Sequence, residues 1–323
     1  MKGFDEIYSG LSSLFEEADF EKQRLRRGRI RAALLWICIG VLVVFFILYS
    51  DISNFAFILV FALVLFLFSY IHVFRSYRDK YKNYFKSALF IRMVRSIGPN
   101  LSYLKNGKVP LKYYNSSGLF SKVCSDYEGE DYIYGEYEDF YLNLSELSIS
   151  RSRAGCMIGT LMPAQNSDFT GLFMALEFSN DFPACLKILP SNPTVAFLEK
   201  IFHDNEEDSF QKVEIGLVSF DNEFDTLTDE PENASTLLTP EFLEKVLALK
   251  NSYGHVYFSF RINYFFMALH CVDDMFEPYL EGSSDDPEQL KNIYEQLRGP
   301  IEMAECVAVI NRNEILHPGS RAE

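Results

Sequence analysis

The stretch RAALLWICIGVLVVFFILY, residues 31–49, decides the architecture because no charged residue follows Arg31 within it. As a helix it would extend about 28 Å, close to the hydrocarbon thickness of a bilayer. A polar break over residues 50–54 leads into a second apolar run, residues 55–74, whose only ionisable residue is His72. An unpaired backbone N–H or C=O group costs free energy in lipid, and a helix pairs these groups internally. The pattern therefore predicts two transmembrane helices joined by a tight turn.

Basic residues at both outer ends of this predicted hairpin give its orientation. The connection between the two runs contains Asp51 and no lysine or arginine. Since basic residues stay on the cytoplasmic side, we expect both termini to face the cytoplasm in a multi-pass protein. The flanking residues that carry this inference are Arg26, Arg27, Arg29 and Arg31 before the first run, and Arg75, Arg78 and Lys80 after the second.

Apolar stripes continue on both sides of the hairpin. Residues 1–30 are expected to form a cytoplasmic N-terminal helix, and residues 75–98 a membrane-proximal stalk helix that ends near Gly98. The stripes fit packing within the stalk or between subunits of a homo-oligomer; a separate amphipathic helix on the membrane surface is the alternative. The stripe positions are Phe4, Ile7, Leu11, Leu14 and Ala18, then Tyr77, Tyr81, Tyr84, Ala88 and Ile91.

Beyond residue 98 the apolar pattern changes to strands interrupted by helices. Thr239-Pro240 is a helix start signal, and Asp286-Pro287 opens a last helix through about Val309 that Gly299-Pro300 could break. Residues 99–323 are therefore expected to form a cytoplasmic α+β domain with a mainly antiparallel sheet and flanking helices. Strands are expected over 132–144 (with turns at Gly135 and Asp139), over 172–178 and 185–189 as a hairpin, over 213–218, and over 256–269 as two strands bent at 261–263, with exposed loops at 203–209 and 221–236.

The net charge of −15 is unevenly distributed. Lysine and arginine outnumber aspartate and glutamate up to Lys86, so the acidic residues are concentrated in the rest of the chain. An acidic domain repels phosphate backbones, which excludes nucleic acid as the expected partner. The six cysteines contain no CxxC pair, which fits reduced thiols rather than a zinc site.

One acidic segment is a candidate metal site. Glu128, Glu130 and Asp131 could offer oxygen ligands to a divalent cation. They lack the spacing of a calcium loop, and no other acidic motif is placed to complete the shell, so a solvated turn between strands is the competing interpretation. No nucleotide-binding, hydrolase or kinase motif is present, and no cofactor is expected.

Tyrosines crowd the same region. Tyrosine offers contact area and a hydroxyl at low entropic cost, which favours recognition surfaces, but it is also common in half-exposed strands. Both interpretations stay open for the four residues of the possible binding surface, Tyr127, Tyr132, Tyr134 and Tyr137.

Six segments, in this order along the chain, carry a resemblance to a known family: SGLF (117–120), YEGEDYIYGEY (127–137), LSEL (144–147), FTGLFMALEF (169–178), LLTPEFLEKVLAL (237–249) and MFEP (275–278). Together with the basic stretch and the hairpin they resemble the bacterial membrane-protein family catalogued as domain of unknown function 3137. The segment VSFDNEF, residues 218–224, is looser than the corresponding family strand. The resemblance implies a bacterial inner-membrane protein with a cytoplasmic domain, and it implies no activity.

These features predict a membrane-anchored, non-catalytic module that binds a cytoplasmic or membrane protein, or a small ligand. One alternative is an enzyme with an unrecognised active site near Glu128–Asp131. Another is a subunit of a larger inner-membrane complex that assembles through the stalk.

Overall fold

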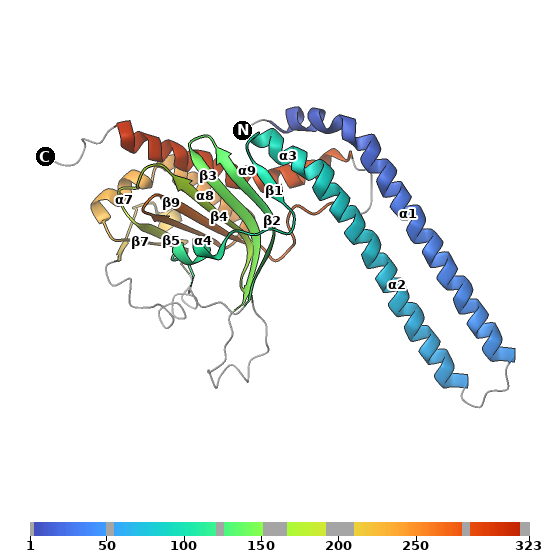
Figure 1. The fold of residues 1–323 in the computed structure, drawn as a ribbon. Helices are drawn as coiled ribbons and strands as arrows, with labels where there is room; N and C mark the ends of the chain where they lie inside the picture. Colours follow the sequence, from blue (N-terminus) through green and yellow to red (C-terminus); the bar gives the residue numbers. More distant parts are fainter. Residues whose placement is uncertain are drawn as a thin grey trace, which may run out of the picture. The chain divides into compact units, whose positions relative to one another are not determined.

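The computed structural model describes residues 3–49, 55–120, 126–150, 167–191, 210–279 and 285–316. They divide into two compact units (Figure 1). A helical unit contains residues 2–93 and 276–293, and a sheet unit contains residues 94–275 and the chain from Tyr294 onward. Segment 276–293 therefore belongs with the N-terminal helices although it lies far from them in sequence.

The helical unit is built on an antiparallel pair, α1 (Phe4–Tyr49) and α2 (Phe55–Phe85), which lie side by side (Figure 1). The N-terminal part of α1 buries Ile7, Leu11 and Ala18, as its stripe predicts. The α2 stripe departs from the prediction. Tyr77 and Tyr81 are buried as predicted, but Tyr84, Ala88 and Ile91 are not. A π-helix, η1 (Lys86–Phe90), adds a residue to the turn after Phe85 and rotates the apolar face beyond it. The buried positions from there to Met93 are Phe85, Lys86, Leu89, Phe90 and Met93.

The apolar halves of α1 and α2 carry large exposed side chains. Leu42 is 66% exposed and Phe68 is 71% exposed. Helices are present over both predicted segments, and the connection over residues 50–54 lies outside the described residues. Among the residues that the structure describes, however, no helix combines the length and the apolar character that a membrane crossing requires.

The sheet unit has nine strands among its described residues, in the order β1-β2-β3-β4-β9-β8-β5-β7-β6, and every pairing is antiparallel. This confirms the α+β class and the antiparallel sheet. The strands are β1 (Ser102–Leu104), β2 (Asp126–Tyr137), β3 (Phe140–Ser150), β4 (Ser167–Phe178), β5 (Leu186–Pro190), β6 (Gln211–Val213), β7 (Phe224–Thr228), β8 (Val256–Arg261) and β9 (Tyr264–His270).

Helical segments pack on both faces of the sheet. On one face, Tyr114 of α4 (Leu111–Ser116) contacts Phe173 of β4 in an aromatic core cluster. On the other face, Phe242 of α8 (Pro240–Tyr253) packs against Phe258 and Phe265. The remaining helices are α3 (Ile91–Ile97), which links the units, α6 (Val218–Asp221), α7 (Pro231–Leu237) and α9 (Pro287–Leu316).

The two predicted helix starts are confirmed. The Thr239 side chain accepts a hydrogen bond from the Phe242 backbone N–H, which caps α8, and Pro240 is its first residue. The prediction that α9 could break at Gly299-Pro300 is wrong, and its end at about Val309 is too early. Burial of Leu297 and Ile301 on either side of Pro300 holds the helix together despite the hydrogen bond that proline removes.

Several predicted strands and loops are corrected. Segments 172–178 and 185–189 do not form a hairpin, because β4 pairs with β3 and β9, whereas β5 pairs with β7 and β8. Both are buried on their two faces, so they lack the alternation that reveals pairing. Gly135 lies within β2 rather than at a turn, while Asp139 is at the turn. Of the predicted strand over 213–218, only Val213 is extended, as the last residue of β6, and α6 begins at Val218. Segment 221–236 contains β7 and α7 rather than an exposed loop, and 203–209 lies outside the described residues.

Candidate functional site

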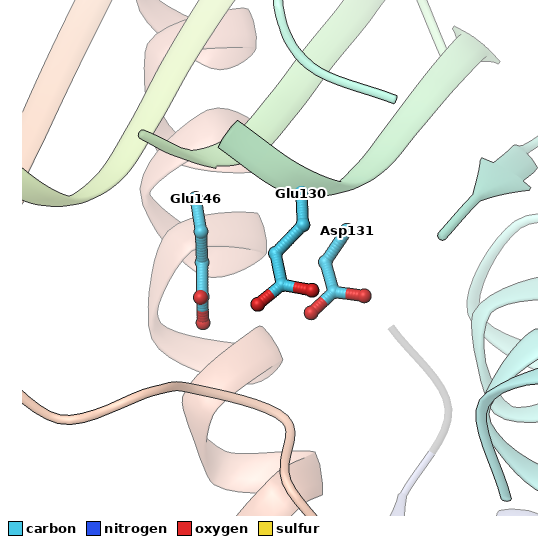
Figure 2. Close-up of side chains that lie close together, drawn as sticks. All are labelled: Glu130, Asp131 and Glu146. Carbon is cyan, nitrogen blue, oxygen red and sulfur yellow. The ribbon is translucent and has the colours of Figure 1, made fainter. Parts of the chain in front are cut away.

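A bulge in β2 brings three carboxylates of β2 and β3 together. Glu130 is paired with Glu146 of β3, and the register then shifts so that the next pair is Ile133 with Leu144. Asp131 lies within this bulge. It is a non-glycine residue with a φ of 59°, and its backbone N–H donates to the Lys105 carbonyl. Figure 2 shows Glu130, Asp131 and Glu146 projecting to the same side of the strands.

Oxygen atoms from the three carboxylates lie within 4.8 Å of one another. The Tyr103 hydroxyl donates a 2.5 Å hydrogen bond to Asp131, which is fully buried. Glu146 accepts a 2.5 Å hydrogen bond from the Met275 backbone N–H. Backbone and hydroxyl donors thus fix two of the three carboxylates in place.

Glu130 and Glu146 also line a cavity of about 460 Å³. Cys271 lies in its wall, where burial raises the pKa of the thiol, so this cysteine is protonated at neutral pH and is a poor nucleophile. We refer to this cavity as the acidic cleft. Its charged lining residues are Lys108, Glu128, Glu130, Glu146, Asp273 and Asp274.

The arrangement corrects the predicted ligand set. Glu128 lines the acidic cleft but is not among the three clustered carboxylates; Glu146 is. The segment is also a strand and not a solvated turn. The statement that no other acidic group completes the shell is therefore wrong, because strand pairing brings in Glu146 from the LSEL segment. Clustered carboxylate oxygens suit a hard cation such as Ca²⁺ or Mg²⁺, or a cationic group of a ligand.

The four predicted tyrosines do not share one face. Tyr132 stacks on Tyr134 with ring centroids 4.7 Å apart, and its hydroxyl donates to Asn143 on the α4 face. Tyr127 lies on that face as well and contacts Tyr114 of α4. Tyr137 faces the other way, is 7% exposed, and donates a hydrogen bond to Glu305 of α9. Three of the four tyrosines are thus brought to one face.

The predicted anchor flanks lie on the two long helices. Arg29 on α1 stacks over the Tyr77 ring of α2 at 5.1 Å. The other flanks are exposed: Arg26, Arg27, Arg31, Arg75, Arg78 and Lys80. Sequence reasoning missed the inward-facing lysines of the same unit, Lys22 and Lys86, which are both buried. Only their positions within the helical apolar stripes could have singled them out.

Comparison with known proteins yields one family. Residues 167–308 match the profile of a protein of unknown function, DUF3137. No curated protein matches the chain. A solved structure with partial similarity is the crystal structure of the mycobacterial trehalose monomycolate transport factor A, at 9% sequence identity and a TM-score of 0.31, covering 64% of this chain and 90% of that chain.

Three of the segments that carried the resemblance lie within the matched residues, FTGLFMALEF, LLTPEFLEKVLAL and MFEP. They include parts of β4, an interior strand of the sheet, and of helix α8. The match over residues 167–308 therefore supports the resemblance to the DUF3137 family of unknown function that the sequence motifs predicted.

Proposed function

We propose that this chain is a membrane-anchored, non-catalytic binding module of the bacterial inner membrane. The observation that carries the anchor is the exposed apolar surface of the α1–α2 hairpin. Contiguous exposed apolar surface of this kind is rare on proteins that meet only water. Its exposed residues include Leu34, Leu35, Val41, Leu42 and Phe45 on α1, and Val60, Leu63, Val64, Leu67 and Phe68 on α2.

The exposed arginines and Lys80 at the outer ends of this surface support an orientation with both termini in the cytoplasm. Extraction of cell membranes at alkaline pH tests the anchor, because an integral protein stays in the pellet and a peripheral one is released. Release into the supernatant would refute anchoring. Labelling of Ser53→Cys by a membrane-impermeant maleimide, with Gly3→Cys as the protected control, tests the orientation.

The acidic cleft is the proposed ligand site. It offers two half-exposed carboxylates, Glu130 and Glu146, with Asp131 fixed behind them, so it selects a ligand that carries positive charge, a divalent cation being the smallest. Titration calorimetry of the detergent-purified full-length protein with Ca²⁺, Mg²⁺ and Mn²⁺ tests this. Glu146→Gln should weaken binding at least about tenfold, because the neutral amide lacks the negative charge with which the carboxylate attracts a cation. Glu136→Gln, at an exposed position of β2 outside the cleft, is the matched control.

Absence of cation binding would refute this part of the proposal and leave the anchor standing. A protein partner is the other class of ligand, and mass spectrometry of material that co-purifies in mild detergent would find it.

An enzyme is the second candidate function. It is favoured by the three carboxylates that lie together beside a cavity, where a bound metal could activate water. A hydrolytic activity that is lost in Glu146→Gln and kept in Glu136→Gln would move the proposal to that class.

A further inference from the structure

Two histidine rings lie together at one end of strands β8 and β9. The ring centres of His255 and His270 are 6.2 Å apart, and the ring planes are inclined at 63°. The His270 backbone N–H donates to the His255 carbonyl, which extends the antiparallel pairing by one residue beyond Val256 and Leu269. Side chains directly opposite each other on neighbouring strands project to the same face of a sheet. Both imidazoles therefore stand on one face.

The end of helix α8 fixes the position of His255. Gly254 has a φ of 78°, which favours glycine, and its N–H donates to the Lys250 carbonyl to end the helix. The N–H of His255 then donates to the Tyr253 carbonyl. Because the carbonyl of His255 accepts from His270, both of its backbone groups are hydrogen-bonded. The backbone of this residue is thus held in place although its side chain is exposed.

A hydrogen bond orients the ring of the half-buried His270. One ring nitrogen donates to the Thr170 backbone carbonyl, so the other nitrogen keeps a lone pair. Metal-binding histidines are commonly oriented in this way, by donation of the second ring N–H to a carbonyl. Burial, and after it the neighbouring His255, lowers the pKa of His270. The lone pair is therefore free of a proton at neutral pH, as a metal ligand requires.

The distance between the rings suits one shared metal ion. Metal–nitrogen bonds of about 2.0–2.1 Å place the centres of two imidazoles on the same ion at most about 6.5 Å apart. The observed 6.2 Å lies within this limit, and the exposed side chain of His255 opens the pair to solvent. Among the residues that the structure describes, no third histidine, cysteine or carboxylate joins the pair. Water or an external ligand would fill the remaining coordination positions.

We propose that His255 and His270 form a binding site for a divalent transition-metal ion. Imidazole nitrogen suits Ni²⁺, Cu²⁺ and Zn²⁺, of which Cu²⁺ binds most tightly to a given set of ligands, whereas carboxylate oxygen suits Ca²⁺ and Mg²⁺. The pair therefore selects different metals from the acidic cleft, and neither histidine lines that cleft. The site depends neither on the ligand of the cleft nor on membrane anchoring.

Titration of Cu²⁺ into the full-length protein in mild detergent tests the site. The protein is produced without a polyhistidine tag, and excess Ca²⁺ is present to compete for the carboxylates of the acidic cleft. Electron paramagnetic resonance should show couplings from imidazole nitrogens. His255→Gln, at an exposed position, and His270→Gln should each weaken Cu²⁺ binding at least about tenfold and remove one nitrogen from the spectrum. His72→Gln, on α2, and Glu146→Gln, in the cleft, should bind Cu²⁺ like the unaltered protein.

Weaker Cu²⁺ binding in both histidine variants, with Ca²⁺ binding unchanged, assigns the ion to the pair. The proposal is overturned if the unaltered protein binds no Cu²⁺, in which case the two rings form a stacking contact only. It is also overturned if the bound ion has oxygen ligands alone, or if His255→Gln and His270→Gln both bind Cu²⁺ as tightly as His72→Gln. Because His255 is exposed, its variant keeps the test valid even where His270→Gln disturbs the end of β9.

Discussion

The ammonium group of Lys86, which is fully buried in the helical unit, lies 2.5 Å from the carboxylate of Glu277. Lys82 reaches the same carboxylate at 2.7 Å. Lys22 donates to the Tyr279 carbonyl at 3.1 Å, and burial lowers the pKa of its ammonium group. Lysines from both long helices thus hold the segment that begins at Phe276, which explains why it belongs to the helical unit.

Glu277→Gln should destabilise the helical unit. The substitution removes the Glu277 charge that pairs with buried Lys86, and breaking a buried ion pair costs about 3 kcal/mol. Hydrogen exchange of residues 276–279 and 285–293 in detergent should become faster. Glu288→Gln, at an exposed position of the same segment, is the control. Equal exchange in the two variants would show that the pair contributes nothing, whereas Glu277→Gln combined with Lys86→Met should recover part of the loss.

Tyr103→Phe should loosen the bulge that presents the carboxylates. It removes the hydroxyl that donates to buried Asp131, and leaving a buried acceptor unsatisfied costs about 1–3 kcal/mol. Chemical denaturation measures the loss in the free energy of unfolding. Tyr141→Phe, at an exposed tyrosine of β3, should change that free energy by less than about 0.5 kcal/mol. A Tyr103→Phe protein as stable as Tyr141→Phe would contradict the role given to this hydrogen bond.

The stability of the sheet unit should fall in alkali. Burial, followed by the neighbouring Tyr141, Tyr113 and Tyr134, raises the pKa of Tyr132 from 10.0 to about 12. The folded state therefore holds this proton more tightly than the unfolded chain, so the stabilisation is complete below pH 10 and is lost as the pH rises towards 12. Denaturation at increasing pH should show a shallower loss in Tyr132→Phe. An unchanged slope would rule out Tyr132 as a contributor.

Two cysteines of the sheet unit should differ in reactivity. Burial raises the pKa of Cys306 to about 11, and its side chain is 5% exposed. Cys271 lies in the wall of the acidic cleft and is half-buried. Since only an accessible thiolate reacts quickly, iodoacetamide should label Cys271 before Cys306 in the native protein, and both equally in denaturant. Peptide mass spectrometry measures this order, and faster labelling of Cys306 would show that α9 opens readily.

The sequence correctly predicts those features that depend on residues close together in the chain. The two-helix hairpin, the α8 cap at Thr239 and the bend between β8 and β9 all have local signals. No local sequence signal marks the π-helix that begins at Lys86, because packing fixes its extra residue. The apolar positions of this region were therefore predicted on the wrong face of the helix.

The acidic cleft shows the same limit. Glu130 and Asp131 stood out because they are adjacent, whereas Glu146 joins them only through the β2–β3 register. That register contains a bulge at a non-glycine residue with positive φ, which no local pattern marks. The long-range order of the strands is likewise set by which buried faces fit together. The sequence therefore located the acidic segment but could not complete its ligand set.

Thr239→Ala should destabilise α8 and, through it, the face of the sheet that Phe242 covers. The Thr239 side chain satisfies the Phe242 N–H, one of the donors that a helix leaves free at its start, and loss of such a cap costs about 1 kcal/mol. Thr239→Ser keeps the hydroxyl and should retain most of the free energy of unfolding. Because Phe242 packs on Phe258 and Phe265, local exchange of the β8 and β9 amides should rise with the alanine variant. If alanine and serine variants unfold alike, the hydroxyl is not the stabilising group and Pro240 alone sets the start of the helix.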